Sequence, residues 1–129
     1  MKRDMDLVRD ILLAIEAKPS PKPINMTELE VPDHPDSSSR RKHIVMLAGA
    51  GFLDCEPTRS KTNPDRIHHV LVFDLSWKGH DYLDSIRDPK VWKKIKEKSA
   101  QIGNTSFEFT LEIAKALAKQ QLKSVGLDV

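Results

Sequence analysis

The chain of 129 residues lacks the features that mark secreted or membrane-spanning proteins. Its single cysteine, Cys55, cannot form an internal disulfide, so an oxidising compartment is not indicated. The longest apolar run, residues 44–53, has about half the length that a helix needs to cross a bilayer. Residues 1–6 are mostly charged and lack the apolar core of a signal peptide. We therefore expect a cytoplasmic protein without a membrane segment.

The sequence also lacks the spacings that are typical of catalytic and metal sites. No two histidines have the His-x-x-x-His spacing of a zinc site, and the adjacent His68 and His69 would point to opposite faces of a strand. Cys55 has no base fixed near it in sequence, and a lone cysteine in a strand is most often a small buried apolar residue. The glycine-containing stretch 49–51 ends a helix, so no helix dipole is available there to hold a phosphate. We predict that the protein is not an enzyme and needs no metal or other cofactor.

Charge of one sign is not in excess either, because the formal net charge is only +2. Any nucleic-acid binding must then depend on where the charges lie, not on their sum. The 39% of apolar and 31% of charged residues are typical of a globular chain and not of a disordered one. The length fits one domain over residues 1–129 with a core of its own.

In the N-terminal half, apolar residues at helical spacing predict a first helix over residues 4–17, which the proline cluster at 19–23 ends. Residues 24–31 read as a weak strand and residues 32–36 as a loop. One of the serines at 37–39 is expected to cap a second helix over residues 38–50. Its predicted inward face is Ile44, Leu47 and Ala48, and a left-handed cap at Gly49 or Gly51 ends it.

The next two segments, 52–58 and 67–75, have the β-favouring composition of paired strands. The polar stretch 59–66 between them predicts a β-hairpin with a charged tip.

Three further helices are expected after the hairpin. Ser76 should cap the first, and Gly79 within it points to close helix packing, because a glycine weakens a helix by about 1 kcal/mol relative to alanine. Asp88 and Pro89 have the order of a cap and a first helical residue. The second of these helices carries the apolar residues Trp92, Ile95 and Ile102. The third starts at Thr105 or Ser106, and its predicted buried face is Phe107, Leu111, Ala114, Leu117, Ala118 and Leu122.

The order helix, strand, helix and hairpin predicts an α+β fold of winged-helix type, with the hairpin as the wing. One of the usual three helices is missing or reduced to the loop at 32–36. We expect residues 89–125 to form a C-terminal helical extension that packs on the core and builds a dimer. The alternative is a generic α+β domain with one hairpin.

Three stretches resemble one protein family. They are MKRDMDLVR at 1–9, AGFL at 50–53 and LSWKGHDYLD at 75–84, accompanied by His43-Ile44, Leu47 and Trp92. With these residues the sequence is similar, over nearly its whole length, to the bacterial and phage family catalogued as domain of unknown function 2513. The resemblance implies a winged-helix-like fold and implies no activity. Arg40 departs from the family, where an aliphatic residue is more usual, so we expect the start of the second helix to be tilted or exposed.

Two basic clusters suggest nucleic-acid binding. In helix-turn-helix proteins the second helix of the pair enters the major groove, and basic side chains near it contact phosphates. Here Arg40, Arg41, Lys42 and His43 stand in the first turns of that helix, and Arg59, Lys61 and Arg66 lie on the wing. These residues, His43 apart, are the candidate DNA contacts that we single out.

A different partner is suggested by the outward face of the same helix. Val45 and Met46 are expected to face outward. Apolar side chains at these positions are poor readers of DNA bases, and they indicate a surface that a protein partner or a second subunit covers. Burial of Val45 and Met46 would therefore exclude DNA binding by this helix. A third basic run, the lysines of residues 90–98, is expected to be a solvated face, with phosphate or acidic-protein contact as the alternative.

Overall fold

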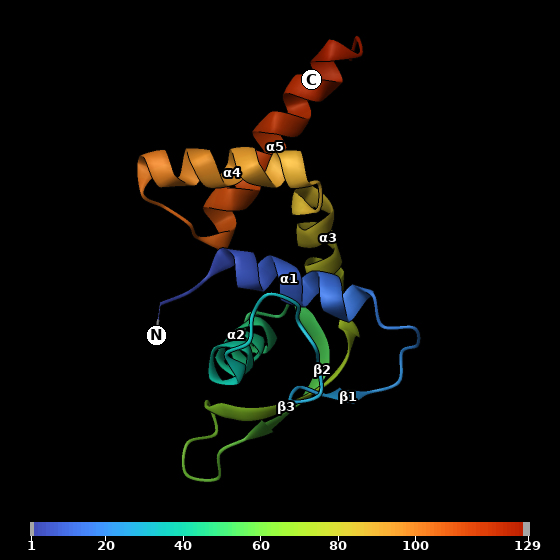
Figure 1. The fold of residues 1–129 in the computed structure, drawn as a ribbon, viewed down its shortest axis with the longest axis vertical. Helices are drawn as coiled ribbons and strands as arrows, with labels where there is room; N and C mark the ends of the chain where they lie inside the picture. The colour runs from blue at the N-terminus through green and yellow to red at the C-terminus, as the bar shows by residue number, and fades with distance from the viewer. Residues whose placement is uncertain (1, 128–129) are drawn as a thin grey trace. The chain divides into compact units, whose positions relative to one another are not determined.

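The computed structural model describes residues 2–127, which hold five helices and one three-stranded antiparallel sheet (Figure 1). In chain order these are α1 (Met5–Glu16), β1 (Ile24–Asn25), α2 (Ser37–Gly49), β2 (Leu53–Arg59), β3 (Ile67–Leu75), α3 (Trp77–Ile86), α4 (Pro89–Ile102) and α5 (Phe107–Ser124). The α+β class is confirmed. The chain divides into two compact units, residues 1–81 and 82–129, with the boundary inside α3. The expectation of one domain over residues 1–129, with 89–125 as an extension that packs on it, stays a prediction.

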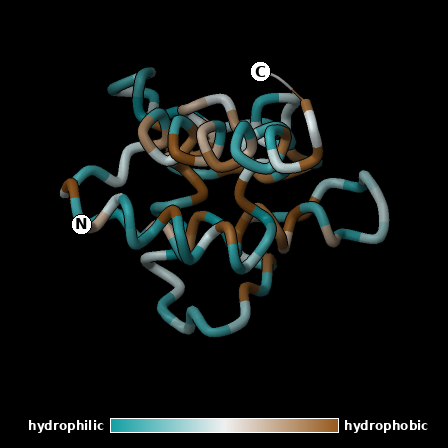
Figure 2. The backbone as a smooth tube through the Cα atoms, turned by 90° about the horizontal axis from the view of Figure 1, so that it is seen from above, coloured by the Kyte–Doolittle hydropathy of each residue, from teal (hydrophilic) through white to brown (hydrophobic). Residues whose placement is uncertain are grey.

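Helix α1 forms because its apolar residues recur on one side of a helix. The carboxylate of Asp4 accepts hydrogen bonds from the backbone N–H groups of Asp6 (3.0 Å) and Leu7 (3.2 Å) and so caps the first turn. The side chains of Leu7, Val8, Ile11, Leu12 and Ile15 are buried. Burial of each such side chain stabilises the fold by about 1.5–3 kcal/mol. Figure 2 shows how apolar and polar residues alternate along the backbone of the chain.

The sheet has the order β1-β3-β2, with β3 in the centre. Ile24 lies opposite Val72, and Leu53 lies opposite Leu75. The predicted strand over 24–31 is wrong beyond Asn25, because the chain turns there: the Glu28 N–H donates to the Asn25 carbonyl (2.9 Å).

The segment between β1 and α2 contains no helix. The sequence analysis predicted this, because one of the three helices of the winged-helix pattern was expected to be missing or reduced to a loop here. It still contributes to the core, since Met26, Leu29 and Val31 are buried. The core therefore includes apolar side chains from a segment that is not helical.

Helix α2 begins one residue earlier than predicted. Its cap is Asp36 and not one of the serines, because the Asp36 carboxylate accepts from the N–H groups of Ser38 (3.0 Å) and Ser39 (3.4 Å). Ile44 and Leu47 are buried as predicted, whereas Ala48 is half-buried. The helix closes through Ala50, and Gly51 then takes a left-handed φ of 84°.

The corner between β3 and α3 packs against Phe52, which lies between α2 and β2. Ser76 caps α3 as predicted, since its Oγ accepts from the Gly79 N–H (3.1 Å). A Cβ on Gly79 would overlap the Phe52 carbonyl oxygen and lie 3.3 Å from the Leu75 Cβ. The predicted close packing at Gly79 is confirmed, and its partner is backbone.

Residues 2–81 thus follow the order helix, strand, helix and hairpin of a winged-helix-like α+β fold. Both α1 and α2 pack on β3, and the hairpin loop projects beyond the sheet near α2 (Figure 1).

In the second unit, α4 and α5 pack together. Asp88 caps α4 and Pro89 is its first residue, both as predicted, and Ser106 caps α5. The Tyr82 hydroxyl lies 2.7 Å from the Thr110 hydroxyl. The Tyr82 ring meets the Phe107 ring edge to face, with 5.1 Å between centroids. These contacts fix α5 at its N-terminal end.

In α4, Trp92 and Ile95 are buried, whereas Ile102, the last residue before the left-handed Gly103, is 67% exposed. The predicted buried face of α5 holds only in its first half: Ala114 is buried and Leu111 half-buried, whereas the whole stretch 118–124 is exposed. Figure 1 shows the reason, since α5 crosses α4 and continues beyond it.

Candidate functional site

An open groove of about 620 Å³ lies between α2 and the base of the β2–β3 hairpin. Its lining comes from the first three turns of α2, the start of β3 and the turn after β1. The lining residues are Met26, Ser38, Arg41, Lys42, Val45, Met46, Asp65, Arg66, Ile67 and His68. The groove therefore brings together the two regions that the sequence analysis singled out, the outward face of α2 and the wing.

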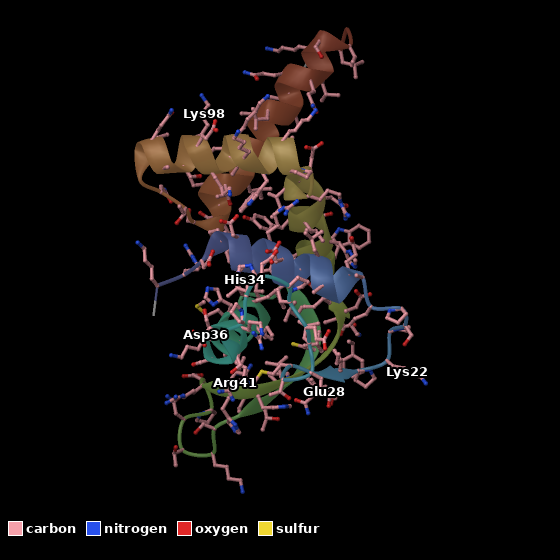
Figure 3. The ribbon with its side chains drawn as sticks, viewed as in Figure 1. Lys22, Glu28, His34, Asp36, Arg41 and Lys98 are labelled. Atoms are coloured by element: carbon pink, nitrogen blue, oxygen red, sulfur yellow. The ribbon has the colours of Figure 1, made fainter. Side chains whose placement is uncertain are left out.

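The periodicity of α2 places its side chains in this groove. Ile44 and Leu47 are buried, so the residues one turn apart on the neighbouring face, Arg41 and Val45, are directed to the groove edge. Figure 3 shows Arg41 between α2 and the hairpin. The helix thus presents a charged pair in its first turns and an apolar pair one turn later.

The hairpin side of the groove is held by its own tip. The Arg66 N–H donates to the Asn63 carbonyl (2.9 Å), and the Arg66 carbonyl accepts from the Ser60 N–H (2.8 Å). His68 shares its strand face with Val70 and Val72, which are buried, but it lies nearer the tip and is exposed. The groove is the part of this sheet face that extends past the core.

The groove is electropositive. Within residues 2–127, no carboxylate forms an ion pair with Arg41, Lys42 or Arg66, and Asp65 is the acidic residue of the lining. The Asp36 carboxylate caps the first turn of α2 and offsets the positive end of its dipole, so the field of the groove comes from these three cations.

The remaining basic candidates lie elsewhere. Arg40 is half-buried and its guanidinium donates to the His34 carbonyl, whereas Ser37 and Ser38 at the start of α2 are exposed. Arg59 donates to the Pro64 carbonyl (3.2 Å) and braces the hairpin tip. Lys61 is exposed on that tip and does not line the groove.

Val45 and Met46, the candidate partner-binding residues, also line the groove. Val45 is half-buried and Met46 is 39% exposed. No helix of residues 2–81 covers them, so the burial that would have excluded DNA is not found in this unit.

His43, which stands in the same basic run, cannot contact a phosphate because it is completely buried. Its Nε2 accepts from the Asp4 N–H (2.9 Å), and its Nδ1–H donates to the Ser39 carbonyl (2.7 Å). Both partners have fixed roles, so the ring is neutral with its proton on Nδ1. The sequence spacing could have predicted this burial, because His43 precedes the inward Leu47 by four residues and so lies on the same face of the helix.

The other side chains that could react or bind a metal lie apart from one another. Burial raises the pKa of the Cys55 thiol, and the adjacent Asp54 carboxylate raises it further. His34 donates to the Asp10 carboxylate (2.8 Å), and His69 pairs with Asn25. Among the residues that the structure describes, no three His, Cys, Asp or Glu side chains are grouped so that they could hold a metal ion. The prediction of a non-enzymatic protein stays a prediction.

None of the helices described here combines the length and the hydropathy that a bilayer span requires.

Comparison with known proteins gives two matches. The family model described as "Hypothetical protein (DUF2513)" matches residues 2–105, which include the whole groove. An uncharacterized protein of Haemophilus influenzae (strain ATCC 51907 / DSM 11121 / KW20 / Rd) is 31% identical over 123 residues, which cover 92% of this chain and 93% of that protein. No solved structure matches.

Proposed function

Because the chain belongs to the DUF2513 family, whose description states no activity, we propose from the groove alone that it binds double-stranded DNA without catalysing a reaction. One observation carries this proposal. Three cationic side chains without ion pairs, Arg41, Lys42 and Arg66, reach the same open groove from α2 and from the hairpin. This is where a winged-helix protein brings its recognition helix and its wing to a duplex.

The charges suit a phosphate backbone. An arginine fork bonds two phosphate oxygens at once, and a lysine attracts a phosphate as a point charge. Lys61, exposed on the hairpin tip, is placed to meet phosphates farther along the strand. These contacts position a protein on DNA without reading its sequence.

The apolar part of the groove is the source of sequence selectivity in this proposal. Val45 and Met46 can contact sugar carbons or the methyl group of thymine, which apolar side chains recognise in the major groove. Removing them should change sequence preference more than it changes the salt dependence of binding.

The second candidate is an acidic peptide as the occupant of the groove. The observation that favours it is the apolar content of the lining, since Met26, Val45, Met46 and Ile67 all contribute to it. A peptide of this kind would use the same cations, but its binding would depend mainly on the apolar residues. The sequence expectation of a protein partner at Val45 and Met46 is retained in this form.

The test is fluorescence anisotropy of a labelled duplex titrated with the full chain at several salt concentrations. For duplex DNA the slope of log K against log salt is about −0.9 for each phosphate contacted. The proposal expects micromolar or tighter affinity and a slope that is shallower by about two in the double variant Arg41→Gln/Arg66→Gln. The matched control is Lys22→Glu, which changes the net charge by the same amount on a loop that Figure 3 places away from the groove.

Absence of duplex binding at low salt would contradict the proposal. Binding that weakens equally in the groove variant and in Lys22→Glu would contradict its location, because net charge alone would then explain the effect.

A further inference from the structure

Helix α4 carries a lysine face that the groove does not use. Lys90, Lys93, Lys94 and Lys98 fall on one side of the helix by their spacing, opposite Trp92, Ile95 and Ser99, which are buried. All four lysines are exposed, and Figure 3 shows the Lys98 side chain standing clear of α4. These four residues are called the α4 lysine face below.

The charge of the chain is concentrated here. Pro89–Ile102 holds five lysines and one glutamate, a formal charge of +4, whereas the whole chain has +2. The rest of the chain is therefore close to neutral or acidic on balance, and α4 is its most basic element.

The stability of the helix does not account for this run. Cations stabilise the last turn of a helix, but the last turn of α4 has none, and Lys90 and Lys93 stand near its positive end. Neighbours at i and i+4, such as Lys90 with Lys94 and Lys94 with Lys98, repel each other.

Pairing and packing do not account for it either. Within residues 2–127, Lys90, Lys93, Lys94 and Lys98 form no ion pair or side-chain hydrogen bond. Lysine stems often cover apolar surface, but the buried apolar residues of α4, Trp92 and Ile95, lie on its opposite side. What remains is a row of free ammonium groups on a rigid support.

We propose that the α4 lysine face is a second phosphate-contacting surface, which binds the backbone of duplex DNA; this inference rests on the proposed DNA-binding function. Lys90 and Lys98 are about 12 Å apart along the helix axis. Duplex DNA carries one negative charge per about 1.7 Å of its axis, so a row of this length meets several phosphates. Lysine acts there as a point charge, so the contact adds affinity and salt dependence without base preference.

The experiment measures the salt slope of duplex binding for the full chain and for Lys94→Gln/Lys98→Gln. Glutamine has nearly the helix propensity of lysine, so α4 stays folded, which far-UV circular dichroism checks. The proposal expects a slope shallower by about two, and Lys94→Arg/Lys98→Arg should restore it. Lys22→Glu, with the same change in net charge, should leave the slope close to that of the wild type.

Each other outcome has a distinct meaning. If the α4 variant behaves like Lys22→Glu while Arg41→Gln/Arg66→Gln lowers the slope, the inference is overturned and the groove proposal stands. If only the α4 variant lowers it, the inference stands and the groove proposal fails. Loss of binding to poly-glutamate with an unchanged DNA slope would assign the face to an acidic protein and overturn the inference, and no duplex binding by the wild type would overturn both.

Discussion

The basic starts of α2 and α4 look alike in sequence but differ in what their side chains do. In α2, the four consecutive basic residues 40–43 have two different roles. Arg40 donates to the His34 carbonyl, and His43 is buried against Asp4. Arg41 and Lys42 instead reach the groove. In α4, by contrast, the lysine face is exposed throughout. A basic run on a helix is therefore a candidate interface only at the positions that the fold leaves unpaired.

The largest effect is expected where the end of α2 is fixed against α3. Gly79→Ala puts a Cβ on the Phe52 carbonyl oxygen, which is backbone and cannot move aside cheaply, so we expect a loss of about 3 kcal/mol in the free energy of unfolding. The matched change is Gly49→Ala, because an added Cβ there meets nothing within 4 Å and the residue lies in α2. It should stabilise by up to about 1 kcal/mol.

Urea denaturation of both glycine variants measures the difference. Equal effects of the two substitutions would show that α2 is not anchored through Phe52.

The second effect concerns the start of α2. His43→Ala removes a completely buried ring and both of its hydrogen bonds, so we expect a loss of about 2 kcal/mol. His68→Ala, at an exposed position, should change stability by less than about 0.5 kcal/mol. Thermal melts of the two proteins test this, and a melting temperature of His43→Ala equal to that of His68→Ala would refute the structural role of His43.

A sharper comparison uses two adjacent arginines. Arg40→Ala should lower stability by about 1 kcal/mol, because it loses the bond to the His34 carbonyl. Arg41→Ala should leave stability within about 0.5 kcal/mol and weaken duplex binding. The two variants have the same net charge, so a larger loss of DNA affinity in Arg40→Ala than in Arg41→Ala would reverse our assignment.

The smallest effect is at Cys55 on β2, the strand that leads to the wing. Burial, and secondly Asp54, raise the pKa of its thiol above 9.0, so the neutral thiol is favoured in the folded state. The corresponding contribution to stability is present below the pKa of the unfolded thiol and is lost as pH rises through the folded pKa. Alkylation by iodoacetamide should therefore need a higher pH in the folded protein than in urea, and Asp54→Asn should lower that pH in part; identical pH profiles of folded and unfolded protein would contradict this.

Local signals in the sequence predicted much of the fold. The caps at Ser76, Asp88 and Ser106 follow from side chains that bond the nearest backbone N–H groups. The hairpin and the inward Ile44 and Leu47 follow from composition and period. The tight position of Gly79 follows from the rarity of glycine inside helices.

The rest depended on contacts between distant segments. β1 ends at Asn25 because a turn follows, and the second half of α5 is exposed because α5 crosses α4 and continues beyond it. At the site, the groove joins α2 to residues 65–68, and no sequence period connects these two stretches. The separate roles of Arg40 and Arg41 required the position of His34, which is set by the loop.

The most direct test of the groove as the DNA contact is the change in backbone amide chemical shifts on adding a duplex to ¹⁵N-labelled full chain. We predict that the amides of residues 38–46 and 65–68 shift with saturating DNA, while those of α1 stay in place. Shifts confined to residues outside the groove, with residues 38–46 and 65–68 unchanged, would contradict the account.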